Sequence, residues 1–178
     1  MIAAFLRDAA KQTLSYDCVG ASLTAPPEGW TVDHNRIEIG SGLADFERAK
    51  RAVREWKMFD MGWVELHPAN APIEVGTTVA VLVNHLGFYS LNAARIVYVI
   101  DEADRFGFAY GTLDDHGESG EERFTVEFDH ESGEVSYDII AFSKPAHPLA
   151  QIGYPIARFF QRSFARDSKS AMLRAMGV

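Results

Sequence analysis

The sequence predicts an α+β fold in which a curved antiparallel sheet wraps a long C-terminal helix. Six segments between residues 63 and 143 alternate apolar and polar side chains with a period of two, which is typical of strands. Short turns separate them, and parallel neighbours would need long crossover connections. Residues 148–176 return to a helical period. This order is satisfied by a sheet whose concave side is covered by an amphipathic helix, the helix-grip arrangement.

Only short elements are expected in the first 40 residues. Residues 3–14 are rich in alanine and leucine and predict a short helix. Residues 16–22 predict a short strand. After a Pro-Pro-Glu-Gly turn, two further extended pieces are expected at residues 30–34 and 36–40.

Residues 41–59 predict the first long helix. Asp45 and Glu47 lie near its start, where negative charge suits the positive end of the helix dipole. Apolar residues recur at steps of three and four, which places them on one face. This stripe consists of Leu43, Phe46, Ala49, Ala52, Trp56 and Phe59.

The six strand candidates are rich in β-branched and aromatic residues, which favour strands. A short loop that ends in Gly133 predicts a hairpin between the last two. The expected strands are residues 63–67, 77–86, 94–101, 105–113, 121–129 and 134–143.

The C-terminal helix, residues 148–176, contains a proline. Pro155 has no backbone amide to donate, so we expect two helical pieces or one bent helix.

Composition restricts the classes of function. The chain has 178 residues, which fits one domain, residues 1–178, with a buried core. A net charge of −8 argues against a nucleic-acid binder, whose domain would be basic. No apolar run is long enough to span a membrane, and the first 14 residues do not resemble a secretory signal. Cys18 is the only cysteine, which excludes an internal disulfide, and we expect a cytoplasmic protein.

The charge is unevenly distributed. Residues 101–134 contain twelve acidic and two basic residues, whereas residues 144–178 contain six basic residues and one acidic residue. Arg158 and Arg162 are four apart and share a helix face. This face is either solvated, paired with the acidic hairpins, or a surface that binds an anion or an acidic partner.

Aromatic residues are frequent on the strand faces expected to point inward. Either they form a plain core with satisfied tyrosine hydroxyls, or they line a pocket for a small hydrophobic ligand. The candidate ligand-binding residues are Trp56, Tyr98, Phe108, Tyr110, Phe124, Tyr137 and Phe159.

Catalytic signals are few. The chain lacks a nucleotide-binding glycine loop, a Gly-x-Ser-x-Gly elbow and a His-Glu-x-x-His motif, and loop 114–122 lacks the spacing of a calcium loop. We therefore expect no cofactor and no metal. Glu122 shares a strand face with Phe124, so it is a candidate general base if it is buried. His116, in the same loop, is the second weak catalytic candidate.

Several segments together resemble the DUF 1990 family of uncharacterised, UPF0548-type proteins. The most specific match is residues 105–113 (RFGFAYGTL), followed by His116 and by residues 120–124 (GEERF). Gly117 departs from the pattern, where many members have a proline. Further matching segments are residues 40–42, 56–59, 96–99, 101–102, 141–143 with Pro145, and 161–172.

The resemblance implies a fold similar to the helix-grip superfamily of START-like proteins and polyketide cyclases. Members of that superfamily bind sterols, lipids, hormones or polyketides, and some are enzymes, so fold alone does not assign a function. Our leading hypothesis is a module that binds a small hydrophobic or lipid-like ligand between the sheet and the C-terminal helix. The alternatives are a cyclase- or hydrolase-like enzyme that uses the same cavity, and a protein-interaction module. The sequence carries no signal for the ligand's identity or for oligomeric state.

Overall fold

The computed structural model describes residues 1–85, 87–114, 116, 118–145 and 150–178. The α-helices are α1 (Ile2–Ala9), α2 (Gly42–Arg54) and α3 (Ala150–Met176), and single 3-10 turns form η1 (Ala21–Leu23) and η2 (Lys57–Phe59). The strands are β1 (Thr31–Ser41), β2 (Val64–His67), β3 (Thr78–His85), β4 (Phe88–Asp101), β5 (Arg105–Thr112), β6 (Glu118–Phe128) and β7 (Glu134–Pro145).

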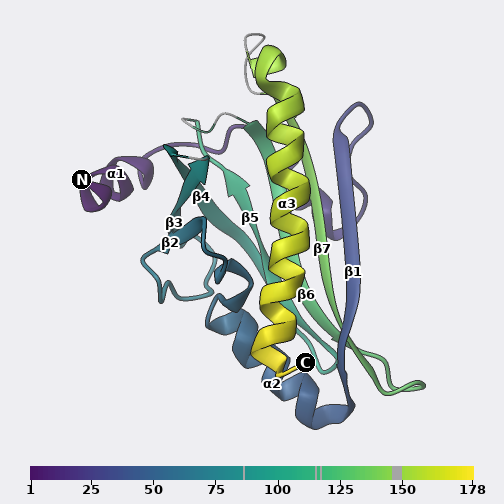
Figure 1. Ribbon diagram of the computed structural model, residues 1–178. Coiled ribbons are helices and arrows are strands. Elements are labelled where there is room, and N and C mark those ends of the chain that lie inside the picture. The colour runs from purple at the N-terminus through teal and green to yellow at the C-terminus, as the bar shows by residue number, and fades with distance from the viewer. Residues whose placement is uncertain (86, 115, 117, 146–149) are drawn as a thin grey trace.

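The strands form one curved antiparallel sheet in the order β1-β7-β6-β5-β4-β3-β2. From β2 to β7, each strand pairs with its neighbour in sequence. β1 lies at the other edge, against β7. α3 runs along the concave side of the sheet, and α2 crosses beneath its C-terminal end (Figure 1). The predicted α+β helix-grip fold is therefore confirmed.

The core fills the end of the concave side where α2 meets α3. Trp56 follows α2 and packs against Phe108 of β5, with 4.7 Å between ring centroids. Its indole N–H donates a hydrogen bond to the carbonyl oxygen of Ala71 at 2.8 Å. Phe124 on β6 and Met172 on α3 are fully buried in the same cluster. Each such side chain contributes about 1.5–3 kcal/mol on burial, so this cluster fixes α3 to the sheet.

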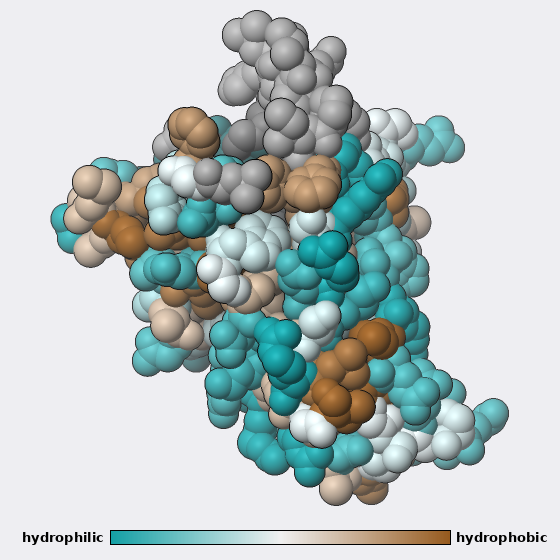
Figure 2. All heavy atoms as spheres, viewed as in Figure 1, coloured by the Kyte–Doolittle hydropathy of each residue, from teal (hydrophilic) through white to brown (hydrophobic). Residues whose placement is uncertain are grey.

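The outer face of α3 is mostly hydrophilic. Figure 2 shows hydrophilic residues over most of the face seen in Figure 1, with a hydrophobic patch near the C-terminus. The helix is continuous from Ala150 to Met176, so of the two predicted forms the two separate pieces are excluded and a single helix is found. Pro155 is the sixth residue of this helix, so it removes one hydrogen bond of the backbone ladder without ending the helix.

Three elements differ in extent from the prediction. β1 is one continuous strand where two pieces were expected, because β7 pairs with it along its length. β4 begins at Phe88, earlier than expected, because β3 supplies backbone partners there. α2 ends at Arg54 because Trp56 has a positive φ of 55°, a left-handed conformation that a helix cannot contain.

Residues 16–22 are not the predicted strand. This segment crosses the convex side of the sheet, where Glu121 of β6 holds it. The Glu121 carboxylate accepts hydrogen bonds from the Tyr16 hydroxyl at 2.7 Å, the Gly20 amide at 2.8 Å and the Ser22 amide at 3.0 Å. The Ser22 hydroxyl also donates to it. The four hydrogen bonds to the buried Glu121 carboxylate thus hold residues 16–22 in place of the backbone pairing that a strand would have had.

A glycine makes room for this segment. Gly111 on β5 lies beneath the Tyr16 ring, and a Cβ atom at that position would stand 2.2 Å from the Tyr16 hydroxyl oxygen. The convex face of β5 therefore receives a side chain from the N-terminal segment at this glycine.

Gly111→Ala is expected to release the N-terminal segment. The new methyl group must displace the Tyr16 ring, which breaks its hydrogen bond to buried Glu121, so we expect a loss of about 1–3 kcal/mol in the free energy of unfolding. Urea denaturation measures the loss, and limited proteolysis reports exposure of residues 10–24. The control is Gly62→Ala, where a Cβ atom meets no other atom within 4 Å. Equal stability of the two variants would contradict the assignment.

Candidate functional site

A cavity of about 520 Å³ lies between the sheet and α3. It occupies the end of the concave side away from the aromatic core. There the sheet and helix contribute small side chains, among them Ala94 of β4, Ala141 of β7 and Ala165 of α3. Alanines leave the space that phenylalanines fill at the other end. Larger apolar groups complete most of the wall, including Val81, Val83, Ile139, Phe160 and Phe164.

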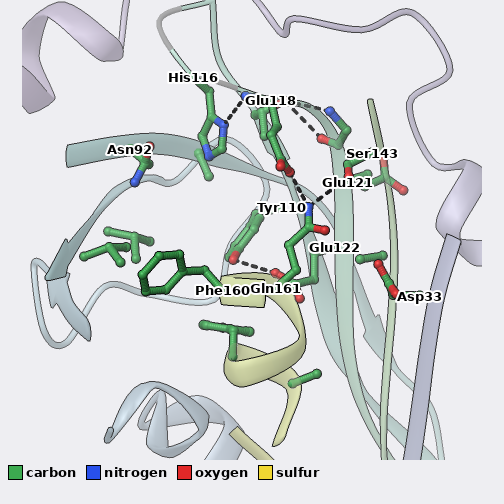
Figure 3. Close-up of a pocket in the computed structure, with 18 of the residues that line it drawn as sticks. Asp33, Asn92, Tyr110, His116, Glu118, Glu121, Glu122, Ser143, Phe160 and Gln161 are labelled. Carbon is green, nitrogen blue, oxygen red and sulfur yellow. Dashed lines mark hydrogen bonds between the residues drawn. The ribbon is translucent and has the colours of Figure 1, made fainter. Parts of the chain in front are cut away.

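Tyr110 and Glu122 form a hydrogen-bonded pair in the wall. They are opposite each other on β5 and β6, so both side chains point to the concave side. The Tyr110 hydroxyl donates to Glu122 Oε2 at 2.8 Å (Figure 3). Burial raises the pKa of Glu122 to about 7, and the charges of Glu118 and Asp33 act in the same direction. The Tyr110 hydrogen bond lowers it, but not enough to offset burial.

His116 contributes a neutral imidazole to the cavity. Its Nδ1 accepts a hydrogen bond from the Glu118 backbone N–H at 3.1 Å. Burial lowers the pKa of His116 to about 4, so the ring is uncharged at neutral pH. Since Nδ1 is an acceptor, the single ring proton is on Nε2. His116 can therefore donate a hydrogen bond to a bound molecule from Nε2.

Polar contacts attach α3 to the sheet beside the cavity. The Arg158 guanidinium makes a two-pronged ion pair with Asp33 of β1, with 2.7 Å between Nη2 and Oδ1. Gln161 donates to Glu118 of β6 and, at 3.1 Å, to the Ser143 hydroxyl of β7. Burial raises the pKa of Glu118 as well. These bonds join α3 to three strands. They lie beside the cavity, where the helix and the sheet make fewer apolar contacts with each other.

The predicted site residues separate into three groups. Tyr110, Glu122 and His116 line the cavity together. Four of the predicted residues lie instead in the adjacent core, where they support the cavity wall. These are Trp56, Phe108, Phe124 and Tyr137. The Tyr137 hydroxyl is satisfied by Ser168 of α3 at 2.9 Å, as expected for a core tyrosine.

Tyr98 and Phe159 lie away from the cavity, which corrects their expected positions. A register shift between Ile96 and Tyr98 inserts one residue into β4 and reverses the face of Tyr98. Its hydroxyl meets the Ser22 hydroxyl on the convex side at 2.6 Å. Phe159 is 63% exposed on α3, whereas its neighbour Phe160 lines the cavity.

Sequence reasoning missed several cavity residues. Asn92 was outside the expected strand, because the N-terminal half of β4 was not predicted. Gln161 carries a weak signal in the sequence, because a polar residue on a helix is usually solvated. The signal that could have found it is that Phe164 and Ala165, three and four residues later, are apolar. The other missed residues include Asn35, Ser90 and Ser143.

Among the described residues, no three histidine, cysteine, aspartate or glutamate side chains are grouped so that they could hold a metal ion. None of the helices in the described part of the chain has the length and apolar character that a membrane span requires.

The match to a family model covers residues 15–171 and is described as a domain of unknown function, DUF1990. The chain belongs to this family. A UPF0548 protein from Dictyostelium discoideum is 43% identical, with 82% of this chain and 73% of the relative covered. A UPF0548 protein from Deinococcus radiodurans is 39% identical, with 99% and 94% covered.

Solved structures of low sequence identity share the fold of this family member. A START superfamily protein from Mycobacterium smegmatis has a TM-score of 0.54 at 8% identity, with 84% of this chain and 98% of that chain covered. A point mutant of norcoclaurine synthase from Thalictrum flavum, in complex with a transition-state analogue, has a TM-score of 0.55 at 12% identity, with 83% and 94% covered. These similarities show a START-like fold.

Glu122→Gln is expected to remove a pH dependence of stability. Burial raises the pKa of Glu122 in the folded state to about 7, whereas the ordinary pKa of a glutamate is 4.5. The folded state therefore binds the proton more tightly, and wild-type stability falls as the pH rises from about 4.5 to about 7. Glutamine stays neutral, so the free energy of unfolding of the variant relative to wild type should rise by up to about 3 kcal/mol over this range.

Urea denaturation at pH 4.5, 6, 7 and 8 measures this difference. Glu131→Gln is the control, because Glu131 is exposed in the hairpin loop between β6 and β7. A difference between Glu122→Gln and wild type that does not change with pH would contradict a buried, protonated Glu122.

Proposed function

We propose that the protein binds a small, predominantly apolar ligand in the cavity between the sheet and α3. The observation that carries this proposal is the cavity itself. Its volume of about 520 Å³ falls within the range of about 300–1,000 Å³ typical of small-molecule sites. Its wall combines apolar side chains with a few polar groups, the pattern by which such sites bind and orient a ligand.

The fold relatives support this proposal by analogy. The norcoclaurine synthase structure contains a transition-state analogue, so a protein of this fold accommodates a small organic molecule. At 12% identity the two proteins share the fold alone, and the feature of this chain that supports binding is its own cavity.

Ala141→Phe is expected to abolish binding of an apolar probe. The phenyl ring would project from β7 into the cavity and occupy the space of the ligand. The probe is N-phenyl-1-naphthylamine, a neutral dye whose fluorescence rises in apolar surroundings. We expect wild type to bind the dye saturably. The affinity of the variant for the dye should be at least about tenfold weaker, because the new phenyl ring takes the space in which an aromatic ring of the dye would contact the cavity wall.

Ile140→Phe is the matched control, since it introduces the same ring at the adjacent position of β7, which faces the opposite side of the sheet. Equal binding by both variants would place the dye elsewhere and contradict the proposal. Native mass spectrometry of the purified protein provides an independent measurement, in which a ligand bound to wild type should be absent from Ala141→Phe.

A second candidate function is acid–base catalysis in the same cavity. It is favoured by the presence of Glu122 and His116 in one cavity wall, with pKa values moved in opposite directions. A carboxylate with a pKa near 7 is suited to accept a proton at neutral pH, and a neutral imidazole can donate a hydrogen bond to a carbonyl oxygen.

This candidate predicts proton exchange on a carbonyl compound. With 2-tetralone in D₂O, Glu122 would take a proton from the carbon beside the carbonyl, the electron pair would move to the oxygen, and a deuteron would return to the carbon. NMR should show exchange with wild type that is at least about tenfold slower with Glu122→Gln. Glu131→Gln should retain the wild-type rate. Equal exchange rates for wild type and Glu122→Gln would exclude Glu122 as the base.

A further inference from the structure

We infer that the ligand carries a protonated amine and that Glu122 binds it. This inference rests on the proposed function, because it requires a ligand in the cavity. It identifies the chemical class of that ligand, an apolar body with one cationic nitrogen.

Glu122 has acceptor capacity to spare. Within the described part of the chain, its carboxylate receives one hydrogen bond, from Tyr110 to Oε2. A carboxylate can accept about four hydrogen bonds, two on each oxygen. Oε1 is therefore available to a ligand in the cavity that Glu122 lines.

The other acidic side chains near the cavity have partners. Asp33 is paired with Arg158 by two hydrogen bonds. Glu118 accepts a hydrogen bond from Gln161. Glu121 faces the convex side, where four donors surround it. Glu122 is thus the acid best placed to bind a ligand.

No lysine or arginine is found among the described residues that line the cavity. His116 is neutral at pH 7, and its Nδ1 is occupied by the Glu118 amide. His85 Nε2 is hydrogen-bonded to Ser90 at 2.7 Å. A charged carboxylate in apolar surroundings is unfavourable unless a cation accompanies it. Because none of the described lining residues supplies that cation, we assign it to the ligand.

The groups around Glu122 determine how binding depends on pH. They come from five strands, one loop and the helix: Asp33 of β1, His85 of β3, Tyr110 of β5, Glu118 of β6, Tyr137 of β7, His116 and Arg158 of α3. The two tyrosines stay protonated, since burial raises the pKa of each well above 10. The negative charges of Glu118 and Asp33 oppose ionisation of Glu122 but also favour a ligand cation.

The test compares three probes with one apolar body: 4-phenylbutylamine, 4-phenylbutan-1-ol and 4-phenylbutanoate. Isothermal titration calorimetry with wild type at pH 8 should give at least about tenfold tighter binding of the amine than of the alcohol, because the ion pair adds to the shared apolar contact. The carboxylate probe should bind most weakly. At pH 7, titrations in buffers of different ionisation enthalpy should detect release of a proton on amine binding, as Glu122 ionises.

Glu122→Gln should remove both the amine preference and the proton release, while the affinity for the alcohol changes by less than about threefold. Glu118→Gln is the matched control, because it neutralises another acid on the same strand that already has a partner. It should retain a preference for the amine of at least about fivefold.

The outcomes distinguish failure of the amine inference from failure of the proposed function. Alcohol binding that Ala141→Phe abolishes, without an amine preference in wild type, would overturn the inference and leave the cavity as the binding site. An amine preference that survives Glu122→Gln or disappears in Glu118→Gln would also overturn it. If none of the three probes bound to wild type, the inference would be rejected together with the proposed function.

Discussion

The packing of α3 on the concave side of the sheet is the constraint on which the rest of the structure depends. Near its C-terminal end the helix is fixed by large buried side chains, with Met172 against the cluster of Phe108 and Phe124. Farther toward its N-terminal end, the sheet and helix present alanines and the space between them stays open. One helix thus serves as a core element along one part and as the wall of a cavity along another.

The open part of the helix needs another source of attachment, and polar bonds provide it. Arg158 and Gln161 extend to Asp33 and Glu118 on the sheet. Buried polar contacts of this kind add little net stability compared with apolar packing, but they are directional. They fix the helix at a set distance from the sheet without filling the space between. The basic C-terminal segment seen in the sequence is therefore partly explained as an internal attachment of the helix.

The sequence predicted the fold well because it depends on periodicity over long segments. All six later strands were predicted, although the first six residues of β4 were missed, and the inward faces of β5, β6 and β7 were correct. The site was predicted less completely because single-residue events alter the alternation. One extra residue in β4 moved Tyr98 to the convex side, and one position along the helix separates exposed Phe159 from Phe160 in the cavity wall. Local patterns do not encode such shifts, because tertiary pairing determines them.

Glu121 and Glu122 show why position decides the chemistry of identical side chains. They are adjacent in β6, so the strand places them on opposite sides of the sheet. Glu121 meets the N-terminal segment, which supplies four donors and makes it a structural anchor. Glu122 meets an apolar cavity and one tyrosine, so burial raises its pKa to about 7. Glu122 has fewer hydrogen-bond partners than Glu121, so its burial is less favourable for folding. The same lack of partners leaves its carboxylate able to interact with a ligand.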